Sequence, residues 1–140
     1  MFEMKMPESG TKTNSVQEIM SLEQDAMEHW CKGDVEKYLE ISADDVTYFD
    51  PGTAKRLDGI VELSRHYRRF AGQFHFDRFE FVNPKIEISA DFAVLTYNLI
   101  AYEDAKAEHW NITNAYRKIR GSWKICHTHA SPTQPKIING

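Results

Sequence analysis

The hydrophobic pattern changes its period once along this chain, and that single change constrains the fold most. Before about residue 70 the apolar residues recur at helical spacing, as Val16, Ile19 and Met20 do. From Phe74 onward the apolar residues alternate with a period of two, which is typical of strands that bury one face. Because helices and strands are segregated along the sequence, we expect an α+β domain.

Capping signals indicate where the helices begin and end. Ser15 and Glu18 form a capping box, so the first helix is expected to begin at Ser15 and to end at Gly33. Asp34 is expected to cap a short second helix, and Asp58 a third. The third helix carries a basic cluster at residues 65–69, which we interpret as a solvated helix face.

The second half of the chain predicts an antiparallel meander. A short strand at residues 46–49 ends in the turn signal Asp-Pro-Gly at 50–52, and a long bent strand is expected over 74–88. A tight turn is expected at residues 120–121. The remaining strands are expected over residues 92–102, 109–119 and 123–130. The three helices of the N-terminal half would cover one face of this curved sheet and leave a cavity.

Composition and charge exclude several classes of partner. We expect one domain over residues 14–133, with a flexible tail at 1–13 and a C-terminal tail at 134–140. The net charge is −4, whereas a nucleic-acid binder needs a basic field, so no nucleic-acid partner is expected. No apolar run approaches the length of about 20 residues that a membrane span needs, and no signal-peptide core is present. We therefore expect no membrane partner and a cytoplasmic location.

Metal-binding and cofactor signals are missing from the sequence. Cys31 and Cys126 lack metal or disulfide spacing and have no adjacent activating base, so they are expected to be inert. His127 and His129 are two residues apart in a predicted strand, so their side chains would point to the same face and could bind one metal ion. The sequence indicates no third ligand for that metal. There is also no Gly-rich phosphate loop and no nucleophile elbow. We expect no metal and no cofactor.

Several segments resemble a known family. Residues 30–34, WCKGD, are similar to the end of the first helix in nuclear transport factor 2-like domains. The closing hairpin at 110–129 resembles SnoaL-like domains and the association domain of calcium/calmodulin-dependent protein kinase II, and the segments at 46–51 and 82–86 strengthen that comparison. The resemblance extends over residues 15–131. It implies a cone-shaped, cystatin-like α+β fold, usually dimeric, with a pocket between helices and sheet.

The resemblance does not by itself imply one chemistry. Ketosteroid isomerases, polyketide cyclases and dehydratases of related fold use Asp, Tyr or His as acid–base groups. The pocket of the kinase association domain is lined by arginines. At the matching positions this chain has Asn98, Asn114 and Ala130.

The expected strand register brings polar side chains together. A turn at 120–121 would place Asn114 opposite His127 and Ile112 opposite His129. A loop at residues 103–107 would place Thr96 opposite Asn114 and Asn98 opposite Ile112. Alternation then puts all of these on one face of the sheet. The residues expected on that face are Thr96, Asn98, Ile112, Asn114, Tyr116, His127 and His129.

Buried polar side chains persist when they bond to each other, to water or to a ligand. This cluster is therefore a ligand pocket, an internal hydrogen-bond network or a wet dimer interface.

Five further side chains have two interpretations each. His127 is either a general acid or base, or a structural histidine. Asp50 is either a pocket carboxylate or a turn residue that bonds to the backbone. Trp30, Tyr48 and Tyr67 either line the pocket or pack in the core.

Two functions are compatible with these residues and with the resemblance. The first is a pocket for a small apolar or mixed-polarity molecule, with His127 or Asp50 as the proton carrier of an isomerase, cyclase or dehydratase. The second is an association module without catalysis. In both cases we expect a homodimer through the sheet, with Tyr97, Leu99 and Trp123 as candidates for the buried patch. Whether the chain is an enzyme stays open at this point.

Overall fold

Three helices precede a long meander of strands, in the order that the change of period predicts. The computed structural model describes residues 2–133, with side chains from residue 12 onward. The helices are α1 (Phe2–Cys31), α2 (Glu36–Glu40) and α3 (Ile60–Arg68). The strands are β1 (Ser42–Phe49), β2 (Leu57–Asp58), β3 (Arg78–Ser89), β4 (Phe92–Glu103), β5 (Lys106–Ile119) and β6 (Ser122–Pro132).

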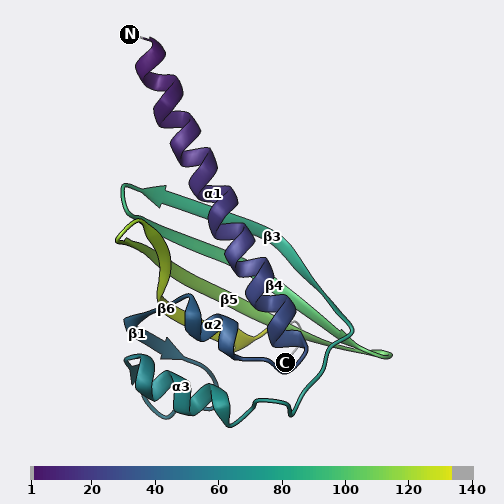
Figure 1. Cartoon of the computed structure of the whole chain (residues 1–140). Coiled ribbons are helices and arrows are strands. Elements are labelled where there is room, and N and C mark those ends of the chain that lie inside the picture. Colours follow the sequence, from purple (N-terminus) through teal and green to yellow (C-terminus); the bar gives the residue numbers. More distant parts are fainter. Residues whose placement is uncertain (1, 134–140) are drawn as a thin grey trace, which may run out of the picture.

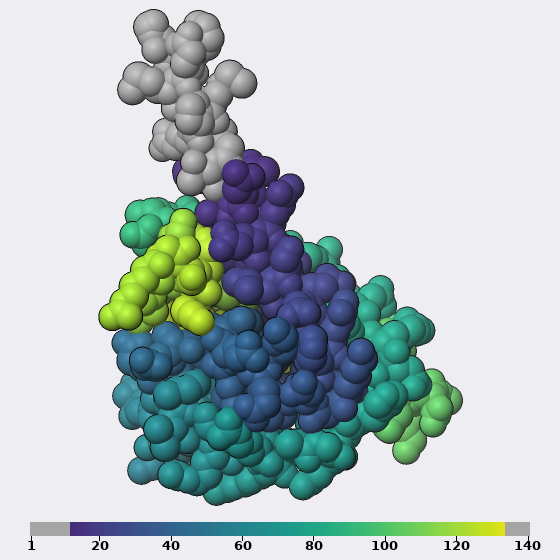
Figure 2. Space-filling view, in the orientation of Figure 1, coloured from purple at the N-terminus to yellow at the C-terminus, as the bar shows by residue number. Residues whose placement is uncertain are grey.

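All six strands form one curved sheet in the order β2-β1-β6-β5-β4-β3. Neighbouring strands are antiparallel, apart from the parallel pair β1 and β6. The helices lie on one face of the sheet (Figure 1), and in the same orientation the N-terminal half of the chain lies in front of the middle of the sheet, with strands visible at both sides (Figure 2). The structure thus confirms the expected α+β architecture.

The core fills the space between α1 and the meander. Helix α1 contributes Ile19 and Met27 to it, and the facing strands contribute Leu95 and Ile125. Ile19 and Leu95 are completely buried. Burial of such a side chain contributes about 1.5–3 kcal/mol to stability, so this layer fixes α1 on the sheet.

The end of α1 is also tied to the segment that leads into β3. Gly33 has φ = 85°, and a Cβ atom there would lie 3.1 Å from the Gly72 Cα. The amide of Gly72 donates a hydrogen bond to the Gly33 carbonyl at 2.9 Å, and that of Phe76 donates to the Cys31 carbonyl at 2.7 Å. This close approach explains the glycine that the sequence predicts as the helix end.

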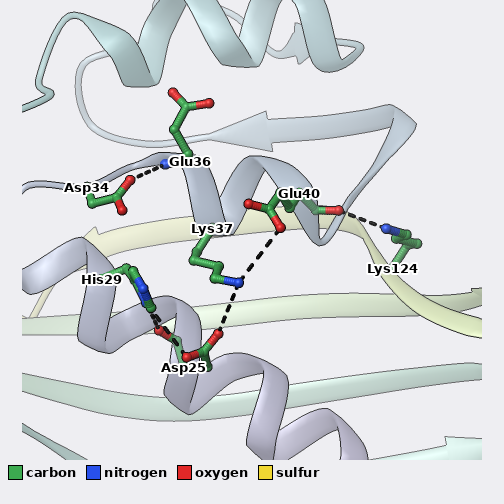
Figure 3. A network of polar contacts seen from close by, with 7 residues as sticks. All are labelled: Asp25, His29, Asp34, Glu36, Lys37, Glu40 and Lys124. Atoms are coloured by element: carbon green, nitrogen blue, oxygen red, sulfur yellow. Dashed lines mark hydrogen bonds and ion pairs between the residues drawn. The ribbon is translucent and has the colours of Figure 1, made fainter.

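Polar contacts attach the short helix α2 to its neighbours (Figure 3). The Lys37 ammonium lies 3.7 Å from the Asp25 carboxylate on α1. On the other side, Lys124 of β6 donates a hydrogen bond to the Glu40 carbonyl at 2.8 Å. Exposed pairs of this kind contribute at most about 1 kcal/mol each, so they orient α2 more than they stabilise it.

Two predicted boundaries need comment. Helix α1 continues upstream of the predicted start at Ser15 to Phe2, and Ser15 is a buried residue within the helix and not its cap. The turn at residues 120–121 is confirmed, because Arg120 and Gly121 both have the positive φ of a two-residue hairpin turn. The domain boundaries and the two tails stay predictions, and residues 134–140 lie outside the described part of the chain.

The predicted register of β4 against β5 is wrong by one residue. Glu103 pairs with Lys106, so the hairpin loop is shorter than the predicted loop at 103–107, and Leu99 therefore lies opposite Trp110. A one-residue shift moves every side chain of a strand to the other face. Thr96 and Asn98 consequently point away from the helices.

A second register error concerns β6. The pairing shifts between Ala115 and Tyr116, so that Tyr116 lies opposite Ile125 as predicted, whereas Asn114 lies opposite Thr128. This bulge turns His127 and His129 to the outer face of the sheet, away from the helices.

The residues suggested for a dimer patch are part of the core. Tyr97, Leu99 and Trp123 are 5%, 7% and 2% exposed within the single chain. They point toward the helices, so the predicted dimer patch is wrong in these three residues.

Candidate functional site

A cavity of about 300 Å³ lies between the helices and the sheet. Helix α1 supplies one wall and strands β4, β5 and β6 supply the opposite wall. Its aromatic lining residues are Trp30, Tyr38, Tyr48, Tyr67, Phe70, Phe74, Phe76, Tyr97 and Trp110. A concave apolar site with a few converging polar groups is the usual form of a small-molecule pocket.

The cavity wall includes a completely buried carboxylate, that of Glu23 on α1. Glu23 stands one helical turn from Ile19 and one from Met27, on the face that α1 turns to the sheet. One carboxylate oxygen accepts the hydroxyls of Tyr38 at 2.8 Å and Tyr97 at 2.6 Å. Three elements thus meet at this one oxygen.

The second oxygen of Glu23 is equally well satisfied. It accepts the Tyr116 hydroxyl at 2.5 Å, and the Asn114 amide lies 2.9 Å from both oxygens. The Thr128 hydroxyl donates to the Asn114 amide oxygen at 2.6 Å, which turns the NH2 group of Asn114 toward Glu23. We call Glu23, Tyr38, Tyr97, Asn114 and Tyr116 the Glu23 cage.

The partners of Glu23 suit a negatively charged carboxylate. Burial, and next the nearby Glu23, raise the pKa of Tyr38, Tyr97 and Tyr116 well above the ordinary value for tyrosine, so all three hydroxyls remain protonated donors. An ionised carboxyl group only accepts hydrogen bonds, and the four donors around Glu23 match that form. Within residues 12–133, Glu23 forms no salt bridge, so its charge has no cationic partner there.

A second polar group lines the cavity at the end of β1. The Asp50 carboxylate accepts the Tyr48 hydroxyl at 2.9 Å and lies 2.7 Å from His66 Nε2 of α3. The side chains of His66 and Asp50 are only 10% and 11% exposed. The other Asp50 oxygen accepts the Gly52 amide at 2.7 Å, so Asp50 is a turn residue and a cavity residue at the same time.

The structure brings together seven of the eleven residues that the sequence suggested. Those that line the cavity are Trp30, Tyr48, Asp50, Tyr67, Ile112 and Asn114, and Tyr116 belongs to the Glu23 cage. Thr96, Asn98, His127 and His129 lie on the outer face. There Asn98 bonds to Asn111 at 2.8 Å, which makes an outer-face pair in place of the predicted cluster.

The two histidines of β6 pack around an exposed phenylalanine. The His127 and His129 rings lie 5.6 and 5.4 Å from the ring of Phe49. His127 Nδ1 is 2.7 Å from the Thr47 hydroxyl. Burial, with a smaller contribution from His129, lowers the pKa of His127 below its ordinary value.

Sequence reasoning missed Glu23 and His66. Glu23 falls within the apolar repeat of α1, where a carboxylate is unusual, and that position was the available signal. His66 lies in the basic cluster at 65–69, of which Arg65, Arg68 and Arg69 are exposed as predicted. His66 and Tyr67 share the buried face of α3 with Leu63, at the spacing of an amphipathic helix.

No metal centre is formed within the described side chains, where no three His, Cys, Asp or Glu residues cluster. Burial raises the pKa of the Cys31 thiol to about 11 and also raises that of Cys126. Neither thiol is therefore activated as a nucleophile. None of the helices in the described residues has the length and apolar character needed to span a bilayer.

Residues 19–135 match the sequence profile of the SnoaL-like domain, which covers most of the chain and the whole cavity. The chain belongs to the SnoaL-like family. No curated protein matches this SnoaL-like chain.

Solved structures agree with this assignment. A proposed ketosteroid isomerase from Parabacteroides distasonis ATCC 8503 is 34% identical, with a TM-score of 0.75 over 84% of this chain and 86% of that chain. A nuclear transport factor 2-like protein of unknown function from Pseudomonas putida KT2440 is 22% identical, with a TM-score of 0.76 over 85% and 87%. The association domain of the C. elegans calcium/calmodulin-dependent protein kinase II is 21% identical, with a TM-score of 0.71 over 88% and 98%. The last two show a shared fold.

The Glu23 cage predicts an unequal response to removal of two tyrosine hydroxyls. Tyr116→Phe takes a donor from a buried carboxylate and should lower the free energy of unfolding by about 1–3 kcal/mol. The matched control is Tyr102→Phe, because Tyr102 also donates to a glutamate, Glu80 at 2.7 Å, but on the surface. Urea denaturation should show a much smaller loss for Tyr102→Phe, and equal losses would contradict the cage.

His127 predicts a loss of stability on acidification. Its pKa is lowered in the folded chain from about 6.5 in the unfolded one, so the unfolded chain binds the extra proton first as the pH falls. The stability contribution of neutral His127 is therefore present above pH 6.5 and is lost as the pH falls through the folded pKa. His127→Gln should flatten this part of the stability curve between about pH 7.5 and 5, measured by urea denaturation. An unchanged slope would show that other groups cause the loss.

Proposed function

We propose that this SnoaL-like protein binds a compact, largely apolar molecule in its cavity and moves a proton to or from it at Asp50. The observation that carries this proposal is the Asp50–His66 pair on the cavity wall, with a separation of 2.7 Å. Asp50 lies nearly buried beside apolar walls, where a carboxylate is poorly hydrated and acts directly on the ligand.

The chemistry follows from the partners of Asp50. Its carboxylate would take a proton from a carbon next to a carbonyl group and return it to another position of the same ligand. His66 and Tyr48 hold the carboxylate in place, since both contact the same oxygen. General acid–base catalysis by one positioned group contributes roughly 10²–10⁴-fold to a rate. The 34% identical relative, a proposed ketosteroid isomerase, supports this class of reaction.

The remaining candidate residues receive separate roles in this proposal. Trp30, Tyr67 and Ile112 shape the apolar walls of the cavity. Asn114 is committed to Glu23 and supports the wall without contacting the reacting atoms. His127, the alternative proton carrier, lies on the outer face and has no part in the reaction.

Proton exchange tests the proposal on any ketone that the cavity binds, whatever the natural substrate is. A thermal-shift screen of compact cyclic ketones would first identify ligands. Hydrogen–deuterium exchange at the carbon next to the carbonyl, followed by NMR in D2O, should then be accelerated by the protein. Asp50→Asn should reduce the acceleration by about 100-fold or more, since it removes the base.

The matched control is Asp44→Asn, because Asp44 is exposed on β1, the strand that leads into Asp50. Exchange that persists in Asp50→Asn, or a screen without any ligand, would contradict the proposal.

We also propose a homodimer through the outer face of the sheet. Phe49 and Phe92 are 37% and 44% exposed there, although both are large and apolar. A structure of similar fold is named an association domain, so a role in assembly alone is the second candidate function.

Light scattering of the full chain tests the dimer. We expect twice the 16.3 kDa chain mass, and Phe49→Asp should shift the protein to the monomer. Val61→Asp is the matched control, because Val61 is 67% exposed on α3, away from the sheet. A monomeric wild type would exclude the dimer, and a large closed ring would favour assembly as the main function.

A further inference from the structure

We infer that the cavity selects a cation, so that its ligand is a compact apolar molecule that carries an ammonium group. This inference rests on the cavity of the proposed function and adds the charge of its ligand. Two features of the same cavity suggest this preference for a cation, namely a buried carboxylate and an aromatic lining.

The charge of the cavity is the first step. Three lining residues are acidic, namely Glu23, Asp50 and Glu108, and among the described residues that line the cavity none is lysine, arginine or histidine. Asp50 has His66 as its immediate neighbour at 2.7 Å. Glu23, in contrast, is completely buried and is held only by neutral donors.

Hydrogen bonds distribute the charge of Glu23 but do not cancel it. Three hydroxyls and one amide stabilise the carboxylate as dipoles, whereas the net charge of the Glu23 cage remains negative. In a site shielded from water the resulting potential is screened weakly, so it acts on whatever occupies the cavity. A cationic ligand would be attracted, and an anionic ligand would be repelled.

The aromatic lining is the second, independent step. Trp30 stands at the centre of a cluster in which the ring centroids of Tyr67, Phe74 and Tyr38 lie 5.0, 5.3 and 5.7 Å from its own. All four rings line the cavity. The negative π face of an aromatic ring attracts cations, so an aromatic wall favours a cationic ligand over a neutral one of the same shape.

Size decides which cations fit. A cavity of about 300 Å³ holds a ring with a few substituents and excludes long flexible polyamines from full burial. The apolar walls formed by Met27, Leu99 and Ile112 favour an organic cation over a hydrated metal ion. The ligand class is thus a small amine or quaternary ammonium compound with an apolar ring.

Three probes of similar size separate charge from shape. Phenyltrimethylammonium and tert-butylbenzene differ only in a central nitrogen cation or a neutral carbon, and benzoate provides the anion. Titration of the full chain, followed by tryptophan fluorescence, should give a dissociation constant for phenyltrimethylammonium at least about tenfold lower than that for tert-butylbenzene. Benzoate should bind more weakly than both.

Two variants locate the source of the preference. Glu23→Gln removes the charge and should lower the cation-to-neutral affinity ratio, leaving only the part that the aromatic rings and the other acidic residues contribute. Glu28→Gln makes the same change on the exposed face of α1 and should keep the ratio. If circular dichroism shows that Glu23→Gln is unfolded, the comparison of the three probes on the wild type decides by itself.

The outcomes distinguish this inference from the proposed function. Equal or tighter binding of tert-butylbenzene or benzoate would overturn the preference for a cation, while the pocket and the Asp50 exchange assay would stand. A cation-to-neutral ratio that is unchanged in Glu23→Gln would overturn the role of Glu23. If the cavity prefers the cation but the exchange does not depend on Asp50, the inference about the ligand's charge stands and the proposed catalytic function is wrong.

Discussion

The structure depends on one acidic side chain, that of Glu23, in the middle of its core. The Glu23 carboxylate would be strongly destabilising if it were buried without partners, because charge is poorly solvated in a protein interior. Its donors come from α2, β4 and β5, so the helix layer and the sheet must be assembled before the charge is satisfied. The Glu23 cage therefore fixes the position of α1 against the sheet and also stabilises the packing of the two.

This polar centre also explains why the interior is hollow. Three tyrosines extend their rings toward Glu23 and hold their hydroxyls at fixed distances from it, so they cannot collapse into the space beside them. The walls further out are large aromatic rings, among them Trp110 and Trp30, and the Trp30 ring meets those of Tyr38 and Tyr67 edge to face. A fold of this size thus retains a cavity that a purely aliphatic core would fill.

Much of the architecture could be predicted from the sequence, whereas the site could be predicted only in part. The switch of period, the glycine at 33 and the turn at 120–121 are local signals, and they led to the correct class and element order. The register depended on the length of the loop after Glu103 and on the bulge in β6, neither of which has a distinct sequence signature. Residues beside helix and strand ends, such as Trp30 and Asp50, therefore do line the cavity, while Asn98 and His127 face away from it. Glu23 was missed because the pattern of α1 indicates burial but not the partners of a buried charge.

The bulge after Ile125 has a consequence for how such a cavity can diversify. Upstream of it β6 turns Trp123 and Ile125 inward, and downstream it turns Thr128 and Ala130 inward. A slip of one residue in the downstream pairing of β6 with β1 and β5 would exchange that uncharged wall for the imidazoles of His127 and His129. The two imidazoles lie on the outer face of the sheet, a register shift of one residue away from the cavity wall. Such a shift would give the cavity of a related chain two groups that can accept or donate protons.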